Sequence, residues 1–211
     1  MTTKRVVPIR THGEWPELCA HRFGHEAETV ALVLGSAPCV NDDAAAALEL
    51  LAATPDVIAI NRAGIRYSGP VQHWVSIHGE KLFLFRARRD ELGYPQPAVC
   101  MAPTCLPPDR APHFTLWANG PRGGSSALLA AAWALFWGYR RVILCGCPLT
   151  GAEALFDDGS VFTDSCSVPC EGYRAAWTAA MLKGLPLARH VRSMSGWTRG
   201  LLGEPTPEWL A

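Results

Sequence analysis

The chain of 211 residues is 49% hydrophobic and 18% charged, a balance that excludes an intrinsically disordered protein and allows one domain with a large core. Its 19 basic and 19 acidic residues cancel to a formal net charge of zero. Non-specific binding to nucleic acid or to an acidic membrane surface needs excess positive charge, so neither partner is expected.

Apolar segments separated by turn residues predict seven strands, and the near-continuous apolar run of the first suits a strand covered on both faces. In chain order these strands cover residues 29–34, 56–60, 72–77, 98–102, 113–117, 141–145 and 188–192. Helices are expected at about 43–53, 80–91, 126–137 and 173–183. Asn41 or Asp42 is expected to cap the first helix, and Gly138 to end the third.

Strands that alternate with helices at this spacing predict an α/β fold that is Rossmann-like, with a mostly parallel central sheet flanked by helices on both faces. We expect a single α/β domain over residues 1–211. Within it, a core covers about 29–151, a lid-like loop covers 152–170, and a C-terminal helix, strand and tail cover 171–211.

Two loops of small residues stand where a strand or an irregular segment leads into a helix. The first is Gly35, Ser36, Ala37 and Pro38, and the second is Gly123, Gly124, Ser125 and Ser126. Small side chains and free amides at a helix N-terminus allow a phosphate or carboxylate to approach the backbone. A tight turn and an ordinary helix cap use the same residues, so both interpretations stay open.

Three further polar residues follow predicted strands or lie in them. Asn61 ends the second strand and can recognise a base or ribose, or stabilise its own turn. His78 ends the third strand and His190 lies in the last one. Histidine titrates in the range that general acid–base catalysis needs, although either residue can equally be structural.

Several alternative classes are disfavoured. No Lys follows the second glycine loop, as a Walker motif requires, and the first strand is not followed by the GxGxxG pattern of nicotinamide enzymes. Eight cysteines in a chain of this size read as reduced core or incidental thiols. Cys19, His21 and His25 could form a three-ligand cluster, but the cysteine spacings are not those of a zinc ribbon, and no metal site is predicted.

The longest apolar stretch, residues 127–149, is interrupted by Gly138, Arg140 and Arg141. It falls short of the ~20 unbroken apolar residues that a membrane helix needs. The first ten residues lack the apolar core of a signal peptide. We therefore expect a cytoplasmic protein with no integral membrane segment, and the sequence allows an oligomer.

The order of these motifs resembles two related families. The stretches that carry the resemblance are LVLGSAP (32–38), VIAIN (57–61), HWVSIHGEK (73–81) and GGSSALLAAAWALFWGYRRVILCG (123–146). Together they resemble the bacterial single-domain sialyltransferases and, equally, the archaeal hydroxymethylpterin diphosphokinase family, which includes small phage-type members. The resemblance covers most of residues 29–151.

The resemblance implies a nucleotide pocket lined by Ser36, Asn61 and Ser126, and a catalytic His in a later loop. The sequence departs from this pattern in three places. Ser36 stands where Asn is usual, Pro148 stands where an acid often follows the last Gly, and residues 152–170 contain no His. His78 and His190 are therefore the remaining candidates for the catalytic base.

The leading hypothesis is a glycosyltransferase-like enzyme that binds a CMP-type nucleotide-sugar and requires no cofactor. One alternative is a diphosphokinase that transfers a diphosphoryl group from ATP to a small alcohol. It would need Mg²⁺ held by carboxylates, for which Asp42, Asp43, Asp157 and Asp158 are available. Another alternative is a non-catalytic nucleotide-binding protein that lacks the base.

Overall fold

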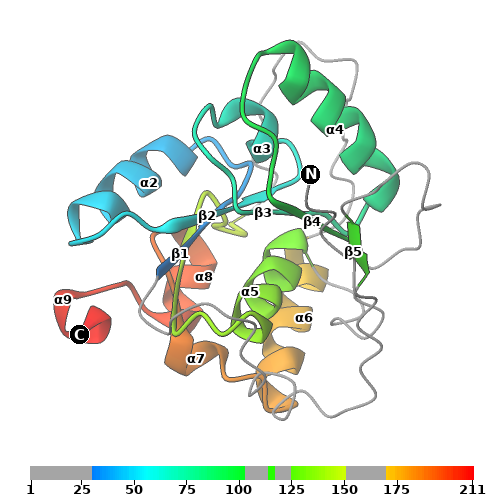
Figure 1. Ribbon diagram of the computed structural model, residues 1–211. Helices are drawn as coiled ribbons and strands as arrows, with labels where there is room; N and C mark the ends of the chain where they lie inside the picture. Colours follow the sequence, from blue (N-terminus) through cyan, green and yellow to red (C-terminus); the bar gives the residue numbers. More distant parts are fainter. Residues whose placement is uncertain (1–29, 103–113, 117–124, 151–169) are drawn as a thin grey trace.

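A computed structural model describes residues 30–102, 114–116, 125–150 and 170–211. Its centre is a seven-stranded sheet in the order β5-β4-β3-β2-β1-β6-β7, with helices on both faces (Figure 1). The six strand pairings are all parallel. The predicted α/β, Rossmann-like fold is confirmed.

The strands agree closely with the segments expected from the sequence. They are β1 (Val30–Leu34), β2 (Asp56–Ile60), β3 (His73–Val75), β4 (Val99–Ala102), β5 (Phe114–Leu116), β6 (Arg141–Cys145) and β7 (Val191–Ser193). The helices are α2 (Val40–Glu49), α3 (Ala63–Arg66), α4 (Gly79–Glu91), α5 (Ser126–Phe136), α6 (Cys170–Leu182), α7 (Leu187–His190), α8 (Gly196–Leu202) and α9 (Pro207–Leu210).

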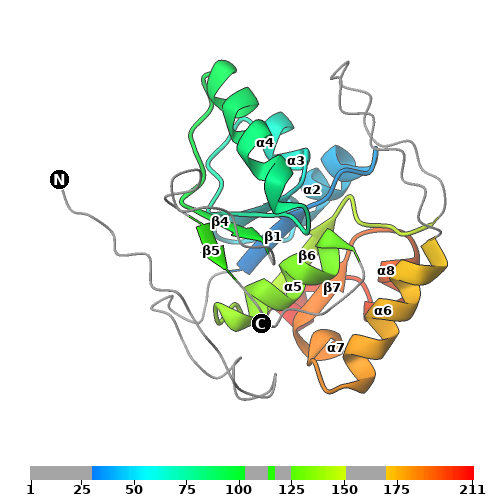
Figure 2. The same ribbon diagram turned by 90° about the vertical axis from the view of Figure 1, so that its right-hand side faces the viewer.

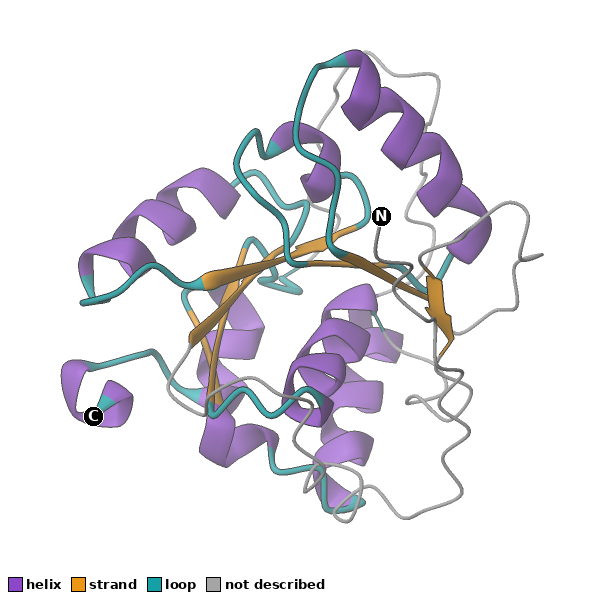
Figure 3. Cartoon of the chain, viewed as in Figure 1, coloured by secondary structure: helices purple, strands orange, loops and turns teal. Residues whose placement is uncertain are grey.

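Alternate strand residues point to opposite faces of the sheet, as the pleat requires. In β1, Val33 packs into a core beneath α5 while Leu32 and Leu34 pack into a second core on the other face. Helices α2, α3 and α4 cover this second face, and α5 to α8 cover the first (Figures 2 and 3). Both faces are thus buried, which explains why the strands read as continuous apolar runs.

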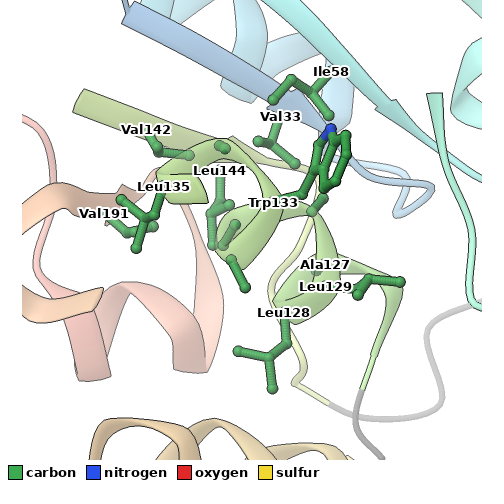
Figure 4. Close-up of a cluster of buried hydrophobic side chains, with 14 of the residues drawn as sticks. Val33, Ile58, Ala127, Leu128, Leu129, Trp133, Leu135, Val142, Leu144 and Val191 are labelled. Carbon is green, nitrogen blue, oxygen red and sulfur yellow. The ribbon is translucent and has the colours of Figure 1, made fainter. Parts of the chain in front are cut away.

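Helix α5 lies at the centre of the larger core. All eleven of its residues are buried, and Leu128, Leu135 and Trp133 extend from it among strand residues such as Val33 and Leu144 (Figure 4). Burying each such large side chain contributes roughly 1.5–3 kcal/mol. Trp133, Trp74 and Trp177 are each at most 1% exposed and are therefore core residues.

Several predicted boundaries are corrected. Helix α2 begins at Val40 and ends at Glu49, and no side chain caps it, whereas the sequence predicted residues 43–53 with Asn41 or Asp42 as the cap. Residues 187–190 form helix α7, so the last strand is shifted to Val191–Ser193. Helix α8 covers Gly196–Leu202, within the segment expected to be a C-terminal tail.

Strands β2, β3 and β6 begin at the amino end of the sheet, where four side chains form one buried network. Trp133 Nε1 donates to His73 Nδ1 at 3.4 Å, His73 Nε2 lies 3.2 Å from Tyr139 Oη, and Tyr139 Oη donates to Asp56 Oδ2 at 2.8 Å. If His73 is neutral with its proton on Nε2, all three hydrogen bonds point the same way, from Trp133 through His73 and Tyr139 to Asp56. The network ends on a carboxylate and joins α5 to β2, to β3 and to the turn that precedes β6.

The described cysteines also belong to the framework. Cys100, Cys145 and Cys147 are buried and reduced. Burial raises the pKa of the Cys100 thiol to about 12 and raises the pKa values of Cys145 and Cys147 as well. Because the thiolate is the reactive form, these three residues are core packing groups and not nucleophiles.

Candidate functional site

The predicted phosphate-binding bend after β1 is occupied largely by the protein's own backbone. The amide of Gly35 donates to the Cys145 carbonyl at 2.7 Å, and the amide of Ala37 donates to the Gly146 carbonyl at 3.2 Å. A Cβ atom on Gly35 would lie 2.1 Å from the Gly146 oxygen. Gly35 is therefore small because β6 ends against it, and neither amide is left to bind an anion.

Ser36 and Pro38 belong to the same bend but differ in their surroundings. Pro38 is exposed. The Ser36 hydroxyl oxygen is buried and has no hydrogen-bond partner among the described residues. Of the four residues predicted at this bend, Ser36 alone offers a buried polar side-chain group.

Asn61 directly follows β2 at the carboxyl end of the sheet, the end at which β1, β2, β3 and β6 stop. Its backbone adopts a left-handed conformation with φ of 47°, which Asn tolerates better than most residues. Its amide donates to the Val75 carbonyl at 3.1 Å, and its own carbonyl accepts from Trp74 Nε1 at 2.7 Å. These bonds hold the strained turn in place.

The Asn61 side chain connects three elements. Its Oδ1 accepts hydrogen bonds from Ser76 Oγ at 2.7 Å and from Ser126 Oγ at 3.3 Å. Ser126 Oγ in turn accepts from the Ile77 amide at 3.3 Å. The ends of β2 and β3 and the first residue of α5 are thereby tied into one cluster, called here the Asn61 cluster: Asn61, Ser76 and Ser126.

The cluster fixes which way the Asn61 amide group is turned. Because two hydroxyl groups donate to Oδ1, the NH₂ group occupies the other side of the amide plane. No described residue accepts a hydrogen bond from it. The arrangement leaves two oriented N–H donors at the carboxyl end of the sheet, which is where doubly wound sheets bind their ligands.

The second predicted loop leads into α5, whose eleven residues are all buried. Ser125 is the N-cap of α5 and accepts from the Leu128 amide at 3.4 Å. Trp177 Nε1 of α6 donates to the same hydroxyl at 3.2 Å. Ser125 therefore acts as a cap, while Ser126 joins the Asn61 cluster. Gly124 lies outside the described residues.

His78 lies at this same end of the sheet. It is the exposed N-cap residue of α4, and its amide donates to Ser76 Oγ at 3.0 Å. Ser76 Oγ also lies 3.2 Å from the His78 carbonyl. The backbone of His78 is thus anchored to the Asn61 cluster.

His190 lies elsewhere. It ends helix α7 just before β7 begins, and its Nδ1 lies 3.0 Å from the carbonyl of Arg140, the residue before β6. Both contacts are at the amino end of the sheet, opposite the Asn61 cluster. Since one base cannot serve a site at the other end of the strands, His190 is removed from the candidate site.

The carboxylates considered for Mg²⁺ are placed as follows. Asp43 is buried, and its Oδ2 accepts from the Gly146 amide at 2.8 Å and from Ser195 Oγ at 2.6 Å. Asp42 is exposed on α2, and Asp157 and Asp158 lie outside the described residues. Within the described part of the chain, no three His, Cys, Asp or Glu residues are grouped to hold a metal ion. Cys19, His21 and His25 also lie outside that part.

Ser76 was not selected from the sequence as a binding residue. It is fully buried and connects Asn61 with His78. The available signal was its position near the end of the predicted third strand, two residues before His78. No described helix is long and apolar enough to cross a membrane.

Comparisons with known proteins agree with this arrangement at the level of the fold. No family model and no curated protein matches the sequence. Solved structures do match. The chain is similar to the sialyltransferase CstII from Campylobacter jejuni in complex with cytidine-5'-monophosphate, with 11% identity over 87% of both chains and a TM-score of 0.56.

Two further structures of this sialyltransferase are similar to the chain. One is in complex with a trisaccharide acceptor and CMP, at 10% identity and a TM-score of 0.59. The other is in complex with CMP-3FNeuAc, at 11% identity and a TM-score of 0.59. Each covers 85% of this chain and 87% of its own chain. The sialyltransferase-like fold implied by the sequence motifs is thus supported, and at this identity the likeness concerns the fold alone.

Proposed function

We propose that this protein is a sialyltransferase-like glycosyltransferase that binds a CMP-type nucleotide-sugar at the carboxyl end of its sheet. The observation that carries the proposal is the Asn61 cluster, which aims an amide group at the end of the sheet beside the N-terminus of α5. The fold shared with a CMP-bound sialyltransferase supports it.

Each part of the cluster has a chemical use in such a site. The oriented NH₂ group of Asn61 can donate to a base, ribose or phosphate oxygen. Helix α5 has eleven residues, and its N-terminus carries a partial positive charge that favours a phosphate. Ser126 fixes this helix end to Asn61, so both donors are held in position before the ligand binds.

The reaction requires one bond to form and one to break at the anomeric carbon of the donor sugar. The acceptor hydroxyl oxygen bonds to that carbon while the bond from the carbon to the phosphate oxygen breaks. CMP leaves with the electron pair, and its charge is stabilised by the donors of the site. A general base takes the proton from the acceptor hydroxyl.

His78 is the base that we propose among the described residues. Its imidazole is exposed at the carboxyl end of the sheet, and its backbone is bonded to Ser76. No metal is needed for this reaction, because the leaving phosphate is neutralised by hydrogen bonds and the helix N-terminus. We therefore expect CMP binding to be the same in EDTA and in Mg²⁺.

The test is the binding of CMP, measured by titration calorimetry. ATP is titrated in the same way, because the competing diphosphokinase hypothesis predicts that the protein binds ATP. Asn61→Asp keeps Oδ1 and tolerates the left-handed backbone, but replaces the donor NH₂ with a charged oxygen. It should weaken CMP binding about tenfold or more and leave the melting temperature nearly unchanged. Asn41→Asp on the exposed first turn of α2 is the matched control.

Two results would count against the proposal. If Asn61→Asp and Asn41→Asp bind CMP equally well, Asn61 does not face the ligand. If the wild type binds ATP only in the presence of Mg²⁺ and does not bind CMP, the diphosphokinase alternative replaces the glycosyltransferase.

A further inference from the structure

Arg62, which follows Asn61 in the chain, and Ser36, which follows β1, carry buried polar groups. Arg62 is 6% exposed, and its Nε and Nη2 atoms have no hydrogen-bond partner among the described residues. The buried Ser36 Oγ has none there either. An unpaired charge inside a protein is costly, and buried polar groups are nearly always satisfied. These groups therefore need an explanation.

Arg89 is a buried arginine of the same fold that has a structural role. It is fully buried, and its guanidinium donates to the carbonyls of Pro95 at 2.5 Å, Gly64 at 2.5 Å and Gly69 at 2.6 Å, and also to that of Tyr67. Four backbone oxygens thus satisfy one side chain. The described residues offer Arg62 Nε and Nη2 no such acceptors, so we infer that its burial serves another purpose.

The positions of Arg62 and Ser36 in the fold indicate what that purpose is. In the parallel pairing of β1 and β2, Leu34 is opposite Ala59. Ser36 and Asn61 each follow two residues later, and Arg62 comes next. Both unpartnered groups therefore lie at the carboxyl end of adjacent strands, beside the Asn61 cluster.

We propose that Arg62, assisted by the Ser36 hydroxyl, binds an oxyanion of the nucleotide-activated donor and so helps to determine which donor is accepted. This inference rests on the proposed function. A guanidinium group binds phosphate or carboxylate through two parallel hydrogen bonds and is more weakly hydrated than an ammonium group, which suits a buried position. The phosphate or carboxylate of the donor provides the acceptor oxygens for this guanidinium.

The anion has two possible sources in one donor, the phosphate of the nucleotide and the carboxylate of the sugar. Three probes separate them: cytidine has neither group, CMP has the phosphate, and CMP-3FNeuAc has both. Their affinities are measured by titration calorimetry for the wild type, Arg62→Met and Arg66→Met. Arg62 is the N-cap residue of helix α3, and Arg66 is exposed at the other end of that helix. Arg66→Met therefore controls for the loss of one positive charge.

Arg62→Met should bind cytidine as the wild type does. If Arg62 holds the phosphate, the preference for CMP over cytidine falls about tenfold or more. If it holds the sugar carboxylate, the preference for CMP-3FNeuAc over CMP falls by a similar factor. Arg66→Met should keep both preferences. If Arg62→Met also keeps both, the proposal is overturned while the proposed function stands.

Stability without ligand provides a second, independent readout. Arg62→Met removes a buried guanidinium whose Nε and Nη2 have no hydrogen-bond partner among the described residues, so its melting temperature should equal or exceed that of the wild type. A clear decrease would indicate a structural role and overturn the proposal. If the wild type binds none of the three probes, the proposed function fails. In that case the melting temperatures are measured with and without inorganic phosphate. Stabilisation of the wild type but not of Arg62→Met supports the oxyanion site, and an equal change in both proteins refutes it.

Discussion

The two ends of the central sheet both contain buried polar side chains, but they use them differently. At the amino end, Trp133 donates to His73, His73 contacts the Tyr139 hydroxyl, and Tyr139 donates to the carboxylate of Asp56, which accepts the last hydrogen bond. At the carboxyl end, the hydroxyls of Ser76 and Ser126 converge on Asn61 and leave its NH₂ group turned away from them. The first network is closed, which means that each of its donors has an acceptor within the protein. In the second network, the NH₂ group of Asn61 has no acceptor among the described residues.

This difference separates structural polar groups from candidate binding groups. A closed network contributes stability because every buried donor finds an acceptor. Donors that have no hydrogen-bond partner among the described residues, such as Arg62 Nε and Nη2, lower the stability of the empty protein, and such local costs are concentrated at binding sites. Substitutions at the closed network should thus change stability more than binding, and substitutions at the Asn61 cluster the reverse.

The largest effect is expected at Gly35, where the carboxyl end is closed between β1 and β6. Gly35→Ala places a methyl group 2.1 Å from the Gly146 oxygen and 2.5 Å from Cys147 Sγ. We expect a loss of about 3 kcal/mol in the free energy of unfolding, because packed backbone must move. Urea unfolding monitored by circular dichroism measures it.

Gly200 on α8 is the matched control, because a Cβ there meets nothing within 4 Å. Gly200→Ala should raise stability by about 0.5–1 kcal/mol, as expected for glycine within a helix. Equal effects at the two positions would mean that the bend after β1 is not closed by β6, and an anion could then reach the Gly35 amide.

A smaller effect is expected at the amino end from Tyr139→Phe. Removing the hydroxyl deletes the hydrogen bond to Asp56 and the contact with His73. The free energy of unfolding should fall by about 1–3 kcal/mol, while CMP affinity stays within about twofold of the wild type. Tyr67→Phe is the control, since its hydroxyl has no hydrogen-bond partner among the described residues. A large loss of CMP binding in Tyr139→Phe would remove the distinction between the two ends.

The pH dependence of the free energy of unfolding provides a further comparison between the wild type and Tyr139→Phe. Burial, followed by the hydrogen bond to Asp56, raises the pKa of Tyr139 above its ordinary value of 10.0. The folded state therefore retains the proton after the unfolded state has lost it, and stability declines as pH rises above about 10. Tyr139→Phe lacks this contribution, so the stability difference between wild type and variant should narrow above that pH. A constant difference would contradict the closed network.

Sequence reasoning was most successful where a segment is buried on both sides. The strands Asp56–Ile60 and Arg141–Cys145 have the predicted bounds, because a continuous apolar run ends where burial ends. The predicted position of the last strand was wrong because residues 187–190 form a short helix, and the position of β7 is determined by its pairing with β6. A pairing partner about fifty residues away leaves no local pattern.

The candidate site shows the same limit. Asn61 and Ser126 could be selected because each stands where a strand ends or a helix begins, and parallel strands end at one place. The use of Asp43 could not be predicted, since its partners Gly146 and Ser195 are 103 and 152 residues away. Gly35 was selected for a binding role, yet its size is explained by contact with another strand end.

The most direct test of the account is amide hydrogen exchange of the wild-type protein with and without CMP. The amides of Ile77 and His78 donate to Ser126 and Ser76, so CMP bound at the Asn61 cluster should slow their exchange. Exchange of the Gln72 amide, which donates to Val57 at the amino end, should not change. Protection of Gln72 instead, or no protection at Ile77 and His78 while CMP is bound, would contradict a nucleotide site at the carboxyl end of the sheet.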